Sequence, residues 1–187
     1  MKKFLLFSTI FLFLACNIFA FEIKGVKLPD TITVDNHKLI LNGAGKRMKF
    51  FFTIYIGALY LPKKMSNAKD VIEKDIPKRI LMHFIYSKVK PDQIIDAFKD
   101  DFENNAKDIL PEIKKEINTF YSYFDKNLHQ GDEVAITYLP EKGTCIKIQN
   151  QLKGCIKGKL FMKAIFSVWF GDDPPSEGLK DSMLGKE

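Results

Sequence analysis

The pattern of apolar and polar positions predicts that the chain is organised around the stretch from Leu41 to Leu61. Aromatic and β-branched residues dominate its second half, which favours a strand over a helix. Its two faces would both be apolar, one with Thr53, Tyr55, Gly57 and Leu59, the other with Ile54, Ile56, Ala58 and Tyr60. A strand covered on both faces lies inside a sheet. Residues 46–61 as one straight strand would span about 50 Å, so we expect a turn or bulge between Lys49 and Phe52.

Shorter patterns predict the remaining elements. Strands are expected within residues 21–30, at 31–34 and 38–41 around an Asp35-Asn36 turn, and at 78–87, 133–139, 144–149 and 152–157. Helices are expected at 67–74 with Asn67 as the cap, from Pro91 to before Pro111, from about Pro111 to Phe124, and at 160–170. The acidic residues Asp100, Asp101, Glu103 and Asp108 would form the solvated face of the first long helix. Strands and helices are segregated along the chain, which indicates an α+β fold of one domain.

The last two strands contain a pair of cysteines. Pairing Ile148 with Leu152 keeps the apolar side chains on one face, leaves residues 149–151 as the loop and sets Cys145 opposite Cys155. The rival register, shifted by one residue, puts the two cysteines on opposite faces. An oxidising compartment would allow a disulfide between Cys145 and Cys155, so that bond is a hypothesis that depends on the first register.

The N-terminus has the pattern of a secretory signal. Two lysines precede an apolar run that ends in small residues, which predicts a signal peptide at 1–20 and a domain at 21–187. The apolar run is short for a membrane span, which needs about 20 apolar residues. Cys16 leaves open lipidation in place of cleavage after Ala20, and an uncleaved anchor is a third alternative. We expect a periplasmic or secreted protein.

Charge and composition exclude several classes of function. The net charge of +6 becomes +4 without the two signal lysines, which would assist approach to an anionic membrane or ligand but is no nucleic-acid signature. The three histidines lack zinc-type spacing, so neither a metal nor a cofactor is expected. Gly43 and Gly45 are not followed by a dinucleotide-binding fingerprint. They predict a tight turn or close backbone packing instead.

Two motifs resemble a known family. LNGAGKR followed by F-x-x-Y-x-x-x-LYLP, together with GDEVAITYLPEKGT and SVWFGDDPPSEGLKDSMLG, is similar to chalcone isomerase-like proteins, in particular their bacterial secreted branch. The resemblance runs from about Gly25 to Gly185. It implies an open-faced β-sandwich, in which an antiparallel sheet is packed by helices.

The resemblance also implies candidate site residues. Fatty-acid-binding members of the superfamily use an Arg and a Tyr at the positions of Arg47 and Tyr55, although the segment between them is shorter here. Arg47 would hold a carboxylate with its planar fork and Tyr55 would donate a hydrogen bond. This reading predicts a non-catalytic binder of a small amphipathic carboxylate or lipid, with no catalytic residue.

Two other functions remain open at this point. The enzyme branch of the superfamily closes a chalcone to a flavanone with the same Arg, but it has a Thr where this chain has Tyr55. An intramolecular lyase is therefore an alternative that this departure disfavours. The third reading is a periplasmic structural or interaction module, in which Arg47 forms an ion pair with a neighbouring Asp or Glu.

Overall fold

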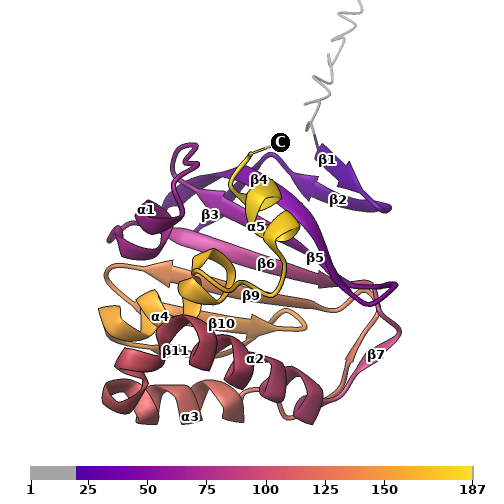
Figure 1. Cartoon of the computed structure of the whole chain (residues 1–187). Helices are drawn as coiled ribbons and strands as arrows, with labels where there is room; N and C mark the ends of the chain where they lie inside the picture. The colour runs from indigo at the N-terminus through magenta and orange to yellow at the C-terminus, as the bar shows by residue number, and fades with distance from the viewer. Residues whose placement is uncertain (1–19, 187) are drawn as a thin grey trace, which may run out of the picture.

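The computed structural model describes residues 20–186 (Figure 1). The predicted signal segment, including Cys16, falls in residues 1–19 and lies outside the described residues apart from Ala20. In the described part of the chain, no helix is both long and apolar enough to cross a bilayer.

A seven-stranded antiparallel sheet forms the centre of the fold, with the strand order β11-β10-β9-β6-β5-β4-β3. These strands are β3 (Thr31–Val34), β4 (His37–Lys49), β5 (Phe52–Leu61), β6 (Lys78–Phe84), β9 (Glu133–Leu139), β10 (Gly143–Ile148) and β11 (Gln151–Ile156). Two small pairs accompany it: β1 (Ala20–Ile23) with β2 (Val26–Pro29), and β7 (Lys88–Val89) with β8 (Leu128–His129).

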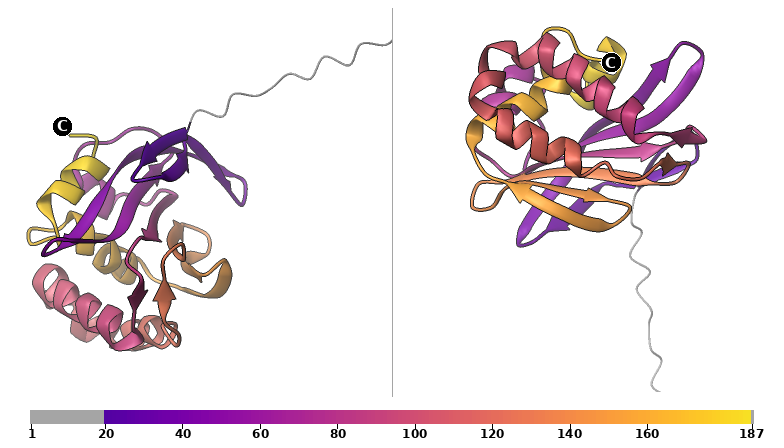
Figure 2. Two further views of the ribbon diagram at one scale, coloured as in Figure 1. Left: turned by 90° about the vertical axis from the view of Figure 1, so that its right-hand side faces the viewer. Right: turned by 90° about the horizontal axis from the view of Figure 1, so that it is seen from below.

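The long helices cover one face of the sheet, as the end-on view in Figure 2 shows. The helical segments are α1 (Ala68–Glu73), α2 (Pro91–Ala106), the 3₁₀ helix η1 (Lys107–Ile113), α3 (Lys114–Ser122), α4 (Lys159–Phe170) and α5 (Glu177–Met183). The apolar α4 contacts α1, α2 and β10 and is buried along most of its length. A second, smaller apolar cluster lies on the other face under the β1–β2 hairpin. The predicted α+β, open-faced arrangement of a helix-packed antiparallel sheet is confirmed.

The stretch from Leu41 to Leu61 is a hairpin. Its turn is Phe50-Phe51, which confirms the expected break between Lys49 and Phe52. β5 lies inside the sheet and contributes to the apolar clusters on both faces. One side chain was predicted wrongly: Ile54 packs on the helix side with Tyr55 rather than on the side of Ile56. A bulge causes this, because Arg47 pairs with Tyr55 whereas Met48 pairs with Thr53.

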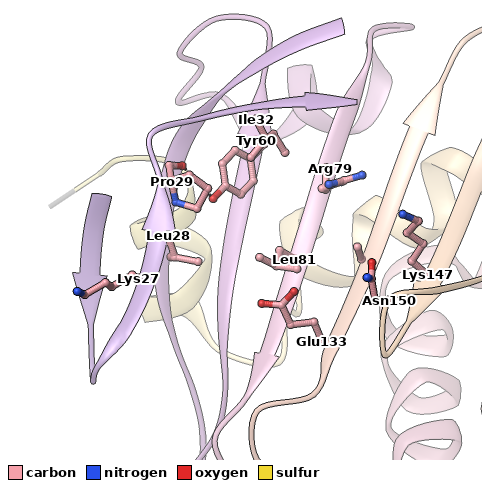
Figure 3. A pocket seen from close by; sticks show the side chains of 11 residues that line it. Lys27, Leu28, Pro29, Ile32, Tyr60, Arg79, Leu81, Glu133, Lys147 and Asn150 are labelled. Atoms are coloured by element: carbon pink, nitrogen blue, oxygen red, sulfur yellow. Dashed lines mark hydrogen bonds between the residues drawn. The ribbon is translucent and has the colours of Figure 1, made fainter. Parts of the chain in front are cut away.

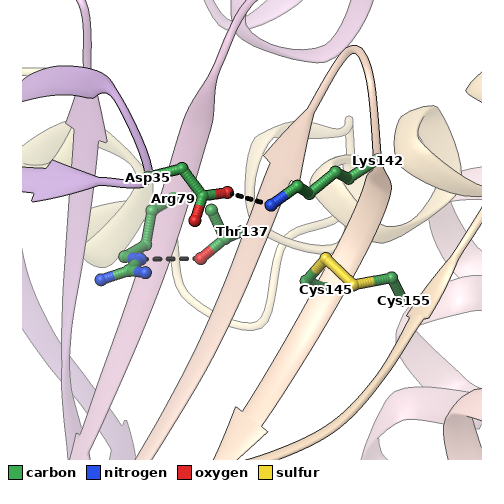
Figure 4. The surroundings of a disulfide bond; sticks show 6 residues. All are labelled: Asp35, Arg79, Thr137, Lys142, Cys145 and Cys155. Atoms are coloured by element: carbon green, nitrogen blue, oxygen red, sulfur yellow. Dashed lines mark hydrogen bonds and ion pairs between the residues drawn. A yellow bond between two sulfur atoms is a disulfide. The ribbon is translucent and has the colours of Figure 1, made fainter.

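The β10–β11 hairpin corrects another prediction. Ile148 pairs with Gln151 rather than Leu152, and the turn consists of Gln149 and Asn150, both at positive φ. Positive φ at both central residues is the geometry of tight hairpin turns that match the sheet twist. A register shift farther along then brings Cys145 opposite Cys155, and their sulfurs are bonded (Figure 4).

One strand boundary and one helix boundary also differ from the prediction. The strand predicted at 78–87 ends at Phe84, because the amides of Ile85 and Tyr86 donate to the carbonyl oxygen of Ile54 at the bulge. Pro111 lies within η1, and α3 begins at Lys114. The expected cap of α1 is confirmed, since the Asn67 side chain accepts from the Asp70 amide at 3.1 Å.

The helix α5 was not predicted, and it explains the glycines of β4. A Cβ on Gly43 would overlap the backbone carbonyl of Ser182, and one on Gly45 would lie 2.8 Å from the Ser182 Cβ. Nearby, the Asn42 side chain donates to the carbonyl of Met183 at 2.8 Å. The glycines therefore permit close packing of α5 on the sheet, as one of the two interpretations anticipated.

Candidate functional site

Arg47 and Tyr55 lie directly opposite each other on β4 and β5. The hairpin brings them together although the turn separates them in sequence. Both lie near the turn, on the face of the sheet that the helices cover. Arg47 is half-buried, and its Nη1 donates to the carbonyl of Met48. Among residues 20–186, no carboxylate oxygen lies within 4.0 Å of its guanidinium. The sheet-end ion pair of the third reading is therefore not formed in the described part of the chain.

These two residues line a cavity of about 630 Å³ between the β4–β5 hairpin and α2. Much of the wall is apolar and includes Phe52, Ile54, Met82, Ile94, Phe98 and Trp169. Charged side chains of both signs also line it, namely Arg47, Lys49, Lys88, Asp96, Asp100 and Asp101. The cavity combines an apolar wall with charged and hydrogen-bonding groups, and small-molecule sites are lined by both kinds of group.

The Tyr55 hydroxyl is hydrogen-bonded to Trp169. The indole Nε1 donates to the Tyr55 hydroxyl oxygen at 3.0 Å, and the Tyr55 ring lies 5.7 Å from that of Phe84. The hydroxyl oxygen acts as the acceptor in that bond, so its proton can be donated to a ligand. Burial raises the pKa of Tyr55 well above its ordinary value. Tyr55 is therefore a protonated donor at any physiological pH.

This chain is similar to known proteins. A family model described as chalcone isomerase-like matches residues 20–185. The chain belongs to the chalcone isomerase-like family.

Solved structures support the fold of this chalcone isomerase-like domain. The crystal structure of a fatty-acid binding protein of Arabidopsis thaliana superposes with a TM-score of 0.68 at 16% sequence identity, over 86% of this chain and 92% of that one. At this identity the likeness establishes the fold alone. Comparison with curated proteins gives no match.

Two residues of the cavity were missed or misread from the sequence. Trp169 was expected only as a core residue of the last helix, and its hydrogen bond to Tyr55 joins positions far apart in the chain. Asp101 was assigned to a solvated face, but it is half-buried and lines the cavity. Burial raises the pKa of its carboxyl to about 6, although the charge of Arg47 opposes the shift. An acidic stripe on a helix gives no signal for this, because only tertiary packing decides which carboxyl is covered.

A second, smaller hollow of about 240 Å³ lies on the opposite face of the sheet (Figure 3). Arg79 of β6 points into it, with its Nε donating to Thr137 Oγ1 at 2.7 Å (Figure 4). Tyr60 borders the same hollow and donates its hydroxyl proton to the Pro29 carbonyl at 3.1 Å. This hollow offers little apolar depth. The arginine in it nevertheless provides an internal comparison for Arg47.

In residues 20–186, no group of three His, Cys, Asp or Glu side chains is arranged to hold a metal ion. The described cavities therefore offer hydrogen bonds, single charges and apolar contact to a ligand.

Proposed function

We propose that this chalcone isomerase-like domain is a non-catalytic binding protein for a small amphipathic carboxylate, of which a fatty acid is the best example. The observation that carries the proposal is Arg47, a guanidinium without a carboxylate partner among the described residues, at the wall of a largely apolar cavity. An arginine fork matches a carboxylate with two parallel hydrogen bonds.

The rest of the cavity suits the remainder of such a ligand. Tyr55 supplies one more donor next to Arg47, and Trp169 fixes its orientation. Aromatic and aliphatic side chains beyond them can cover an alkyl chain or a ring. The cavity volume of about 630 Å³ falls within the range of ordinary small-molecule sites. The structural likeness to the Arabidopsis fatty-acid binding protein supports this choice of ligand class.

Titration of two arginine variants tests the proposal. Arg47→Ala should weaken binding of a medium-chain fatty acid by at least about tenfold, because it removes charge-assisted hydrogen bonds worth about 1.5–3 kcal/mol. Arg79→Ala is the matched control, since it deletes the same side chain on the opposite face of the sheet. Calorimetry that shows equal losses, or no loss with Arg47→Ala, would contradict the proposal.

The isomerase alternative has its own test. A chalcone substrate incubated with the protein and followed by absorbance should cyclise no faster than in buffer. A faster reaction that Arg47→Ala slows would replace the binding proposal with a catalytic one.

We also propose that the protein is exported. The basic and then apolar N-terminus supports export, as does the disulfide between Cys145 and Cys155, a bond that persists in oxidising compartments. Mass spectrometry of the protein from fractionated host cells tests this. A periplasmic or secreted chain that starts at Phe21 would support cleavage, and an acylated Cys16 would identify a lipid anchor instead. A full-length chain in the cytoplasm would end the proposal.

A further inference from the structure

The tip of the β4–β5 hairpin exposes three successive aromatic side chains. Phe50, Phe51 and Phe52 are 85%, 94% and 58% exposed. Single exposed apolar residues are ordinary, but a contiguous group on a soluble surface marks an interaction site. The hairpin tip is defined here as residues 48–52.

Backbone geometry does not account for these residues. Phe50 has a φ of +53° in the two-residue turn, a conformation that glycine, asparagine and aspartate adopt more readily. A bulky aromatic residue therefore occupies this position against the local preference of the backbone. Since it packs on nothing in the described structure that would bury it, its side chain is explained by neither turn formation nor the core.

The tip and its strand neighbours are apolar and basic, whereas the acidic residues that line the cavity, Asp96, Asp100 and Asp101, lie on α2. Met48 and Tyr86 are 43% and 36% exposed, and the Tyr86 ring lies 5.6 Å from that of Phe52. Lys46, Lys49 and Lys88 are exposed around this group, and in residues 20–186 no carboxylate lies within 4.0 Å of their ammonium groups. Aromatic side chains flanked by lysines are the composition of segments that lie in the headgroup region of a bilayer.

The tip also forms one wall of the ligand cavity. Phe50, Phe52 and Tyr86 line the cavity together with Lys49. A bilayer in contact with the tip would therefore lie next to the cavity. Arg47 pairs with Tyr55 two residue pairs beyond the Lys49–Phe52 pair at the end of the hairpin, so it lies close to the tip.

We propose that the hairpin tip docks on an anionic lipid bilayer, with Phe50 and Phe51 inserted among the lipids and the lysines against the headgroups. The charge complementarity of the lysines selects this occupant over a second copy of the chain, whose corresponding surface is equally basic. The idea that a fatty acid passes between the bilayer and the cavity rests on the proposed function. The docking itself does not.

Vesicle sedimentation with matched variants tests the docking. The protein as processed by its host should bind vesicles of phosphatidylglycerol and phosphatidylcholine more tightly than vesicles of phosphatidylcholine alone. Exchange of Met48 and Phe51 for serine should weaken binding about tenfold or more, because these apolar groups would no longer enter the interface. Neither residue lines the cavity. Lys46→Gln should weaken binding to anionic vesicles by roughly fivefold.

Leu152→Ser is the control, because Leu152 is 60% exposed on the far edge strand, outside the tip. All variants share one N-terminus, so any contribution of that segment cancels in the comparison. Vesicle binding that is absent, indifferent to lipid charge, or equally affected by Leu152→Ser would overturn the proposal. So would self-association in sedimentation equilibrium that Phe51→Ser abolishes while vesicle binding is unchanged.

Fatty-acid titration without vesicles separates this inference from the proposed function. The variant at Met48 and Phe51 should bind the fatty acid as the unchanged protein does. In the unchanged protein, fatty-acid binding without vesicle docking would remove the docking alone. Vesicle docking without fatty-acid binding would remove the proposed cargo and leave the docking in place.

Discussion

At the residue scale, the site depends on how Tyr55 and Arg47 are constrained by their neighbours. Tyr55 is fixed by Trp169, so its hydroxyl has one orientation in which it can serve a ligand. In residues 20–186 the Arg47 side chain hydrogen-bonds to the neighbouring Met48 carbonyl and to no carboxylate, and Arg47 lines the cavity. The sequence motifs identified both residues, but their support comes from α2 and α4, which no local pattern connects to β4 or β5.

Tyr55→Phe should weaken carboxylate binding by about fivefold, because one hydrogen bond contributes about 1 kcal/mol. The same change leaves the buried Trp169 N–H without its acceptor, so the free energy of unfolding should also fall by about 1–3 kcal/mol. Tyr60→Phe is the control: its hydroxyl bonds Pro29 on the other face, so only stability should fall. Calorimetric titration and thermal unfolding separate the two effects, and an affinity loss with Tyr60→Phe would contradict this assignment.

Asp101 makes binding depend on pH. Its carboxyl pKa is raised from 3.8 to about 6 by burial, with Asp100 and Asp173 raising it and Arg47 lowering it. Below pH 6 the carboxyl is neutral and does not oppose an anion at Arg47. As pH rises through about 6 it ionises, so affinity should fall, and the stability that the neutral form contributes is lost over the same range.

The measurement is a fluorescence titration with anilinonaphthalene sulfonate, whose sulfonate does not titrate in this range. Between pH 5 and pH 7.5 the affinity of the unchanged protein should decrease, and Asp101→Asn should make the profile flat. Lys49, Lys88, Asp96 and Asp100 also line the cavity and are the same in both proteins. A profile that Asp101→Asn leaves unchanged would assign the pH dependence to another group.

At the scale of elements, apolar periodicity predicted the strands and long helices, because each buries one stripe or face. Apolar periodicity failed where one strand contains an extra residue that has no partner on the neighbouring strand. The bulge at Ile54 and the register shift at Lys153, between Leu152 and Gly154, both arise from pairing between strands. It also missed α5, a short helix whose sequence EGLKDSM carries few apolar residues. The surface of β4 and β5 against which α5 packs includes Gly43, Gly45 and Gly57, and glycines give no hydrophobic signal.

Gly43→Ala should destabilise the domain, because the new methyl group would overlap the Ser182 carbonyl of α5. The expected loss is about 1–3 kcal/mol, as for other overpacked sites. Gly178→Ala is the control within α5, since its methyl group would lie no closer than 4.0 Å, an ordinary contact with the Ser176 hydroxyl, and alanine favours a helix by about 1 kcal/mol. Chemical denaturation should therefore show opposite shifts for the two variants. A stabilising Gly43→Ala would show that α5 does not pack as described.

At the scale of the whole molecule, one sheet separates two different hollows. The helix side provides depth, because α2 stands over β4 and β5 and leaves the cavity of Arg47 between them. The other side is covered mainly by the β1–β2 hairpin and leaves only the shallow hollow of Arg79. The sequence could predict the fold class and name Arg47, but it could not place Arg79 and Arg47 on opposite faces, since that depends on the register of every strand between them.

We propose that the Arg47 cavity holds a carboxylate. Mass spectrometry of organic acids extracted from the protein as purified from its host tests this most directly, with Arg47→Ala purified in parallel. We expect a fatty acid, or another amphipathic carboxylic acid, in the unchanged protein and its loss in Arg47→Ala. An unchanged protein without any such acid, or equal amounts in both proteins, would contradict the account.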